Sequence, residues 1–115
     1  MPYIVYNVYD SGPLTEAAGA GGSGDIDSMG QSKLAISIDV TAVTNGITFS
    51  LLRKGLDGIY YTVKSWTKIT SAGEIVDSVG PGLNIAHLAG GIFQLAWVVD
   101  ASGSATFTAS IEGMQ

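Results

Sequence analysis

Apolar and polar side chains alternate along two long segments of this chain, residues 34–41 and 105–112. In the first segment every even position is aliphatic, and in the second the odd positions are Ala, Phe, Ala and Ile. Successive side chains of a β-strand point to opposite faces of its sheet, so a period of two places one set in a core and the other in solvent. The pattern predicts antiparallel strands that are buried on one face only.

Further runs of β-branched and aromatic residues lie between turn-forming residues. Asn45-Gly46 predicts a hairpin, residues 55–58 predict a second turn, and residues 101–104 predict a last hairpin. Residues 92–99 are apolar on both faces, which indicates an interior strand or one whose outer face meets another subunit. The predicted strands cover residues 3–9, 33–43, 47–54, 59–66, 74–79, 92–100 and 105–112, and residues 83–88 are ambiguous.

The spacing of the turns predicts an all-β fold, which we interpret as one antiparallel β-sandwich of jelly-roll type. A chain of 115 residues is long enough to bury a core without metal or disulfide cross-links. Residues 33–115 are predicted to form the sandwich, and residues 1–32 an extended N-terminal arm with a glycine-rich linker. Residues 14–18 are compatible with one helical turn, which the following glycines would end.

The expected core consists of apolar strand residues and most of the aromatic ones. Trp66, Trp97, Tyr60 and Tyr61 could stack on a sugar, but aromatic strand residues are more often core. The side chains predicted to be largely buried are Ile36, Ile38, Phe49, Leu51, Tyr61, Val63, Leu95, Trp97, Phe107 and Ile111.

Composition narrows the classes of function. Charged residues are 13% of the chain, about half the usual share, and the net charge is −5. A general nucleic-acid partner is disfavoured, because phosphate contacts need a basic surface. Cys is absent, which excludes disulfides and thiolate metal sites. Neither a signal peptide nor a membrane-length apolar run is visible, so we expect synthesis in a cytoplasm and no membrane partner.

Residues that could support catalysis or bind a cofactor are few. His87 is the only histidine and has apolar neighbours, which favours a structural or surface role. Asp25 and Asp27 resemble a fragment of a calcium loop, but Met29 stands where a third oxygen ligand is needed. The glycine clusters lack the Lys-Ser/Thr that follows a phosphate-binding loop. We therefore predict no catalytic, cofactor or metal site and no enzymatic activity.

Two groups of residues are candidates for contacts with a partner. Four bases between positions 53 and 68 could face an acidic partner, or could simply protect and solvate one hairpin. The strand-like strip near the N-terminus could add to a neighbouring subunit or a capsid, or could pair with its own sandwich. The candidate residues are Tyr3, Ile4, Val5, Tyr6, Val8, Tyr9, Arg53, Lys54, Lys64 and Lys68.

A series of short motifs recurs here in a recognisable order. Asp39-Val40-Thr41-Ala42-Val43 is followed by Gly55-Leu56-Asp57-Gly58, Trp66, Ile69-Thr70-Ser71-Ala72-Gly73 and a final strand ending in Phe107-Thr108-Ala109-Ser110-Ile111-Glu112-Gly113. Over residues 35–113 the chain resembles small β-sandwich virion proteins of tailed bacteriophages and prophages. It departs from them in reading Leu-Asp-Gly for Pro-Asp-Gly, and in lacking an Arg that those proteins often carry in the strand matching residues 92–99.

The resemblance implies a non-enzymatic decoration, or cement, protein that binds and stabilises the outside of a phage capsid. Its expected partners are the major capsid protein and further copies of itself, as a homo-oligomer such as a trimer. Its expected location is the virion, after synthesis in the host cytoplasm. A tail or head–tail joining component and a carbohydrate-binding module remain alternative hypotheses, and a small enzyme is the least favoured.

Overall fold

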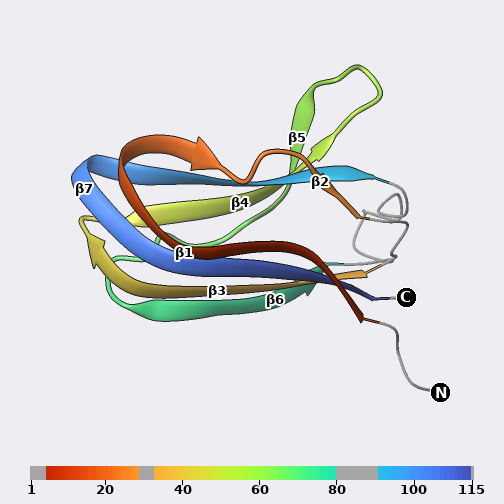
Figure 1. The fold of residues 1–115 in the computed structure, drawn as a ribbon. Helices are drawn as coiled ribbons and strands as arrows, with labels where there is room; N and C mark the ends of the chain where they lie inside the picture. The colour runs from red at the N-terminus through yellow and green to blue at the C-terminus, as the bar shows by residue number, and fades with distance from the viewer. Residues whose placement is uncertain (1–4, 29–32, 80–90, 115) are drawn as a thin grey trace.

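The computed structural model describes residues 5–28, 33–79 and 91–114 of the chain. These residues form an all-β fold in which the strands pair antiparallel in one curled sheet (Figure 1). The prediction of an all-β antiparallel fold is confirmed. The strands are β1 (Val5–Gly22), β2 (Ile26–Asp27), β3 (Lys33–Thr44), β4 (Ile47–Lys54), β5 (Tyr60–Ser65), β6 (Gly73–Val79) and β7 (Ile92–Met114).

The long strand β7 organises the sheet. Its residues 93–99 pair with β4, whereas its residues 104–114 pair with β3. On the other side β1 follows β7 through both halves, and β2 pairs with the start of β7. The order β5-β4-β7-β3-β6 therefore describes a sheet that bends along β7 and folds into two layers (Figure 1). The segment 92–99 is an interior strand, the first of the two alternatives that its apolar faces indicated.

The core lies between the two layers. Buried residues of β3, β4 and β7 alternate with partly or fully exposed ones, as the period of two requires. The Phe107 ring packs edge to face on Phe49 and Trp97, with centroid separations of 5.1 Å and 5.0 Å. Eight of the ten predicted core residues are buried. Tyr61 is an error, since it is 53% exposed on a hairpin that projects from the core, and Val63 is only half-buried, although it packs against the core.

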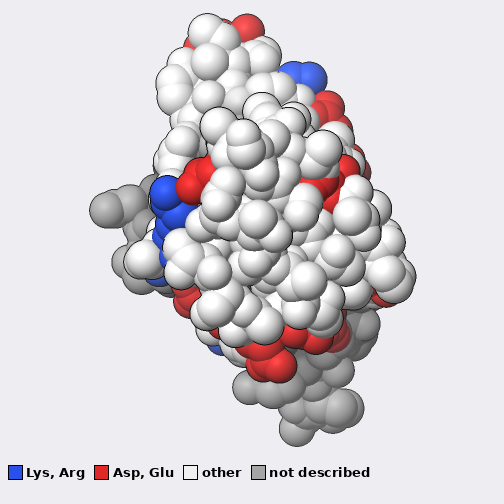
Figure 2. All heavy atoms as spheres, turned by 90° about the vertical axis from the view of Figure 1, so that its left-hand side faces the viewer, with Lys and Arg blue, Asp and Glu red and all other residues white. Residues whose placement is uncertain are grey.

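The two predicted hairpins at Asn45-Gly46 and residues 101–104 are wrong. β3 and β4 do not pair with each other but lie on opposite halves of β7, and residues 101–104 are a bend inside β7. Asn45 and Ser102 adopt positive φ, of 72° and 60°. At each of these two positions the chain turns a corner into the other layer instead of reversing direction within the same layer. The corners lie together at one end of the molecule, whose surface is largely uncharged (Figure 2).

The predicted N-terminal arm and flexible linker are also corrected. Residues 5–22 form one strand that pairs with β7, and residues 14–18 are part of it rather than a helical turn. The small residues near the end of this strand have a packing role. A Cβ on Gly21 would collide with the Trp97 indole, which donates a 3.0 Å hydrogen bond to Glu16 Oε1. The glycines therefore let the chain cross an aromatic core residue.

Candidate functional site

The hairpin of β4 and β5 projects beyond the two layers of the sheet (Figure 1). Its strands are in register from Lys54 opposite Tyr60 to Leu52 opposite Thr62, and a register shift follows between Leu51 and Leu52. The shift separates the outer part of the hairpin from the part that packs on the core. The turn predicted at residues 55–58 is confirmed, and it lies at the outer end of this hairpin.

The loop at the end of the hairpin is held by its own hydrogen bonds. The Asp57 carboxylate accepts from the Ile59 amide at 2.9 Å and from the Tyr61 hydroxyl at 2.6 Å. The Gly55 amide donates to the Ile59 carbonyl at 2.7 Å, and the Gly58 amide donates back to Gly55 at 3.0 Å. The hydrogen bond between Tyr61 and Asp57 lowers the pKa of Asp57, as the Ile59 amide also does, and it raises the pKa of Tyr61. The loop thus has a defined shape.

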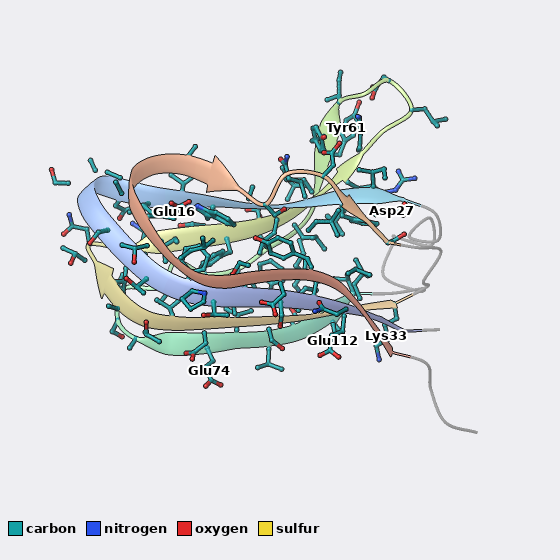
Figure 3. All side chains as sticks on the ribbon, in the orientation of Figure 1. Glu16, Asp27, Lys33, Tyr61, Glu74 and Glu112 are labelled. Atoms are coloured by element: carbon teal, nitrogen blue, oxygen red, sulfur yellow. The ribbon has the colours of Figure 1, made fainter. Side chains whose placement is uncertain are left out.

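Three apolar side chains are exposed on this loop and beside it. Leu56 is fully exposed, and Ile59 and Tyr61 are 56% and 53% exposed. We call these three residues the apolar tip. Figure 3 shows Tyr61 on the projecting hairpin, away from the core. Scattered single apolar residues on a surface are ordinary, but three on one ordered loop form a patch of the kind used for contacts.

Asp25 fastens the hairpin to the rest of the chain at Lys54 and Tyr60, the strand pair next to its turn. It accepts a hydrogen bond from the Tyr60 hydroxyl and lies 3.7 Å from Lys54 Nζ. The hydrogen bond raises the pKa of Tyr60. Lys54 Nζ also lies 5.9 Å from the centroid of the Tyr60 ring. The linker between β1 and β2 therefore braces the hairpin through Asp25.

The four bases predicted as a partner surface do not form an open basic patch. Lys54 faces Asp25, and Lys64 Nζ and Lys68 Nζ lie 3.3 Å and 2.8 Å from the carboxylates of Asp77 and Asp100. Arg53 is half-buried, and its Nε is buried without a hydrogen-bond partner. The lysine pairs span strands and corners of the chain itself. A contact of these bases with an acidic partner therefore stays a prediction, beside the alternative that they protect and solvate one hairpin.

The six N-terminal candidates are placed only in part. Tyr3 and Ile4 lie outside the described residues. Val5 and Tyr6 pair through their backbones with Met114 and Gly113, and Val8 and Tyr9 are half-buried against the core. The described part of the strip therefore belongs to its own sheet, which was the alternative to an intermolecular arm.

The remaining chemical candidates do not converge on one site. Within residues 5–28, 33–79 and 91–114 no group of three His, Cys, Asp or Glu side chains is placed to hold a metal ion. His87 lies outside that part of the chain. Trp97 is buried and Trp66 is half-buried, so together with Tyr60 and Tyr61 they do not present one stacking platform.

No helix among the described residues is long and apolar enough to cross a membrane.

Sequence reasoning missed the apolar tip. It assigned Tyr61 to the core and treated residues 55–58 as a turn only. A signal was present, because Leu56 and Ile59 are large apolar residues within and beside a glycine-rich turn, where polar residues are usual.

No protein-family model and no curated protein matches the chain. Among solved structures, that of infectious bursal disease virus Gx strain is similar at 13% identity and a TM-score of 0.28, over 96% of this chain and 40% of that one. The Gt strain gives 12% identity and a TM-score of 0.28, over 98% and 41%. This chain spans about two fifths of those viral chains. Likenesses at this level carry no argument about fold or function.

Proposed function

We propose that this protein is a non-enzymatic structural protein of a phage virion, which binds and stabilises the outside of the capsid as a homo-oligomer. The observation that carries the proposal is the apolar tip, Leu56, Ile59 and Tyr61, held out from the body on an ordered hairpin. The motif order described above, which resembles phage virion proteins, supplies the class of partner, namely a major capsid protein.

The apolar tip has the properties of a binding anchor. Its loop is fixed by hydrogen bonds to Asp57, so little conformational freedom remains to be lost on binding. The Asp57 carboxylate beside it is exposed and ionised, but its oxygens accept hydrogen bonds from the Ile59 amide and the Tyr61 hydroxyl, so the tip suits an apolar pocket with a polar rim. Three side chains offer a few hundred Å² at most, below the roughly 800 Å² per partner of a stable interface, so several copies would have to act together.

The strand pairing supports a jelly-roll interpretation of the curled sheet. Dividing β1 and β7 at their bends yields one layer in the order β1-β7-β3-β6 and a second in the order β2-β7-β4-β5, with the end of β1 beside β2. The chain changes layer within β1 and β7, at Asn45 between β3 and β4, and between β5 and β6. We infer that this is a small jelly roll, a fold common in viral shells.

The alternatives have less support. A carbohydrate-binding module would need aromatic rings on one open surface, and the four candidates are divided between core, crossover and hairpin. A tail or head–tail joining role would use the same apolar tip, so the partner has to be identified by experiment.

Cosedimentation tests the proposal. The protein would be mixed with purified heads and, separately, with purified tails of the phage that encodes it. We expect wild type to sediment with heads, and the double variant Leu56→Ser/Ile59→Ser to lose binding while keeping its melting temperature. Val98→Ser, at an exposed apolar residue of β7 away from the hairpin, serves as the matched control. Sedimentation with tails alone, or equal binding by the tip variant, would refute the proposal.

A further inference from the structure

The outer edges of the sheet differ in how they are protected. β1 carries three register shifts and Pro13, devices that prevent another strand from pairing. β5 is only six residues long, and its pairing with β4 contains a register shift, so it is a short and irregular edge. β6 pairs with β3 from Gly73 to Val79 without a shift, and it contains no Pro or Lys. No described strand pairs with its other side. β6 is therefore the most regular of the edges formed by β1, β5 and β6, although it carries Glu74 and Asp77, and Asp77 is already bonded to the Trp66 indole and to Lys64.

The exposed side chains of β6 suit a further strand. Val76, in the middle of β6, is 77% exposed. Shallow hollows lie on both sides of it, one over the face of β3 and one beside Trp66 and Lys68. Glu74 points away from the sheet (Figure 3). A strand added to this edge could place alternate side chains in the hollows, as in recognition by strand addition.

We propose that β6 pairs antiparallel with β6 of a second copy, about a two-fold axis at Val76. The inference rests on the homo-oligomer of the proposed function and specifies its contact. In this register Val76 faces Val76, Glu74 faces Ser78, and Ile75 faces Asp77, so no like charges are directly opposed. A two-fold contact must be self-complementary in this way.

The strand is self-complementary although the chain is acidic. A foreign strand would need uncharged or basic residues opposite Glu74 and Asp77. A second copy in this register meets that need, because it places Ser78 and Ile75 there. Asp77 Oδ1 accepts the Ser78 amide hydrogen at 2.8 Å, which removes one donor from the end of the strand. Pairing would therefore depend on the middle of β6. Such a short contact is below the size of a standard interface, and we expect association near micromolar concentration.

Charge variants at the axis test the contact. In Val76→Lys and in Val76→Glu, two like charges would face each other across the two-fold axis, and self-association should weaken roughly tenfold or more. An equimolar mixture of the two variants places Lys opposite Glu and should restore a dimer of twice the 11.8 kDa chain mass. Val98→Lys is the control, because Val98 is 52% exposed but lies between Ala20 and Thr48 on an interior strand.

Sedimentation velocity at micromolar protein distinguishes the outcomes. Dimeric wild type and Val98→Lys, monomeric single variants and a dimeric mixture would support the inference. Dimeric or trimeric Val76→Lys, a mixture that stays monomeric, or monomeric wild type would overturn it. A wild-type trimer would also overturn the two-fold β6 contact, but it would agree with the homo-oligomer of the proposed function. Capsid binding by wild type and by the tip variant tests the proposed function separately, so a failure of the β6 contact and a failure of capsid binding are distinguishable.

Discussion

The Trp66 indole nitrogen donates a hydrogen bond of 2.8 Å to the Asp77 carboxylate and so joins the crossover after β5 to the edge strand β6. The same carboxylate accepts from the Ser78 amide and lies 3.3 Å from Lys64 Nζ. The Trp66 amide in turn donates to the Phe49 carbonyl of β4 at 3.1 Å. This chain of contacts links the two layers at the side where β5 and β6 are their outer strands.

Asp77 should make stability depend on pH. The Trp66 hydrogen bond, followed by the Ser78 amide and Lys64, lowers the pKa of Asp77 below its usual 3.8. Ionised Asp77 therefore stabilises the folded state fully above about pH 4–5, and this contribution is lost as the pH falls through the lowered pKa. Asp77→Asn should lose about 1–2 kcal/mol of unfolding free energy at pH 7 and less at pH 2.5. Urea unfolding at both pH values measures the difference.

Asp39→Asn is the matched control, since Asp39 is an exposed carboxylate on the outer face of β3. A loss for Asp77→Asn that is the same at pH 7 and pH 2.5 would show that the charge of Asp77 does not contribute to stability.

Phe107 should be the most sensitive position of the core. It is 1% exposed and packs edge to face on both Phe49 and Trp97, so its removal leaves a cavity lined by two rings. Phe107→Ala should cost about 3–5 kcal/mol in unfolding free energy. Val98→Ala in the same strand should cost less than about 0.5 kcal/mol, because Val98 is exposed. A loss below about 1 kcal/mol for Phe107→Ala would place this ring outside the core.

Gly103 should tolerate no side chain at the corner of β7. A Cβ there would lie 2.5 Å from the Thr44 carbonyl oxygen and 2.9 Å from that of Asp100, and backbone atoms cannot move aside cheaply. Gly103→Ala should therefore cost roughly 1–3 kcal/mol by overpacking. A Cβ on Gly73 meets only the Ser71 carbonyl at 3.8 Å, so Gly73→Ala should be neutral within about 1 kcal/mol. Thermal unfolding compares the two, and equal melting temperatures would contradict this account of the corner.

The sequence pattern located β3 to β6, the two halves of β7 and most of the core, because these depend on local alternation, but it missed β2 and the part of β1 beyond Tyr9. Ile36, Phe49, Leu95 and Phe107 are buried as the period of two predicted. Pairing partners were harder to predict, since a turn sequence such as Asn45-Gly46 fixes a change of direction but not which strand the chain then joins. Here β7 separates β3 from β4, and that arrangement depends on contacts between residues far apart in the chain.

The candidate site was less predictable for a related reason. The exposure of Tyr61 follows from how far the hairpin extends beyond the core, which no local pattern encodes. The basic residues were visible in the sequence, but their carboxylate partners lie up to 32 positions away, as for Lys68 and Asp100. A charge cluster in a sequence therefore says little about the charge that its surface presents.

Deleting residues 1–10 should destabilise the folded chain itself. The deletion removes the pairing of Val5–Asp10 with the end of β7 and takes away Val8 and Tyr9, which pack against the core. Losing these contacts should cost at least 2–3 kcal/mol, equivalent to a fall in melting temperature of about 10 °C or more. Deleting residues 1–4 alone leaves β1 intact and serves as the control. If the longer deletion kept the melting temperature of the full chain but abolished self-association or capsid binding, the segment would act between molecules, and its pairing with β7 would not be what stabilises the fold.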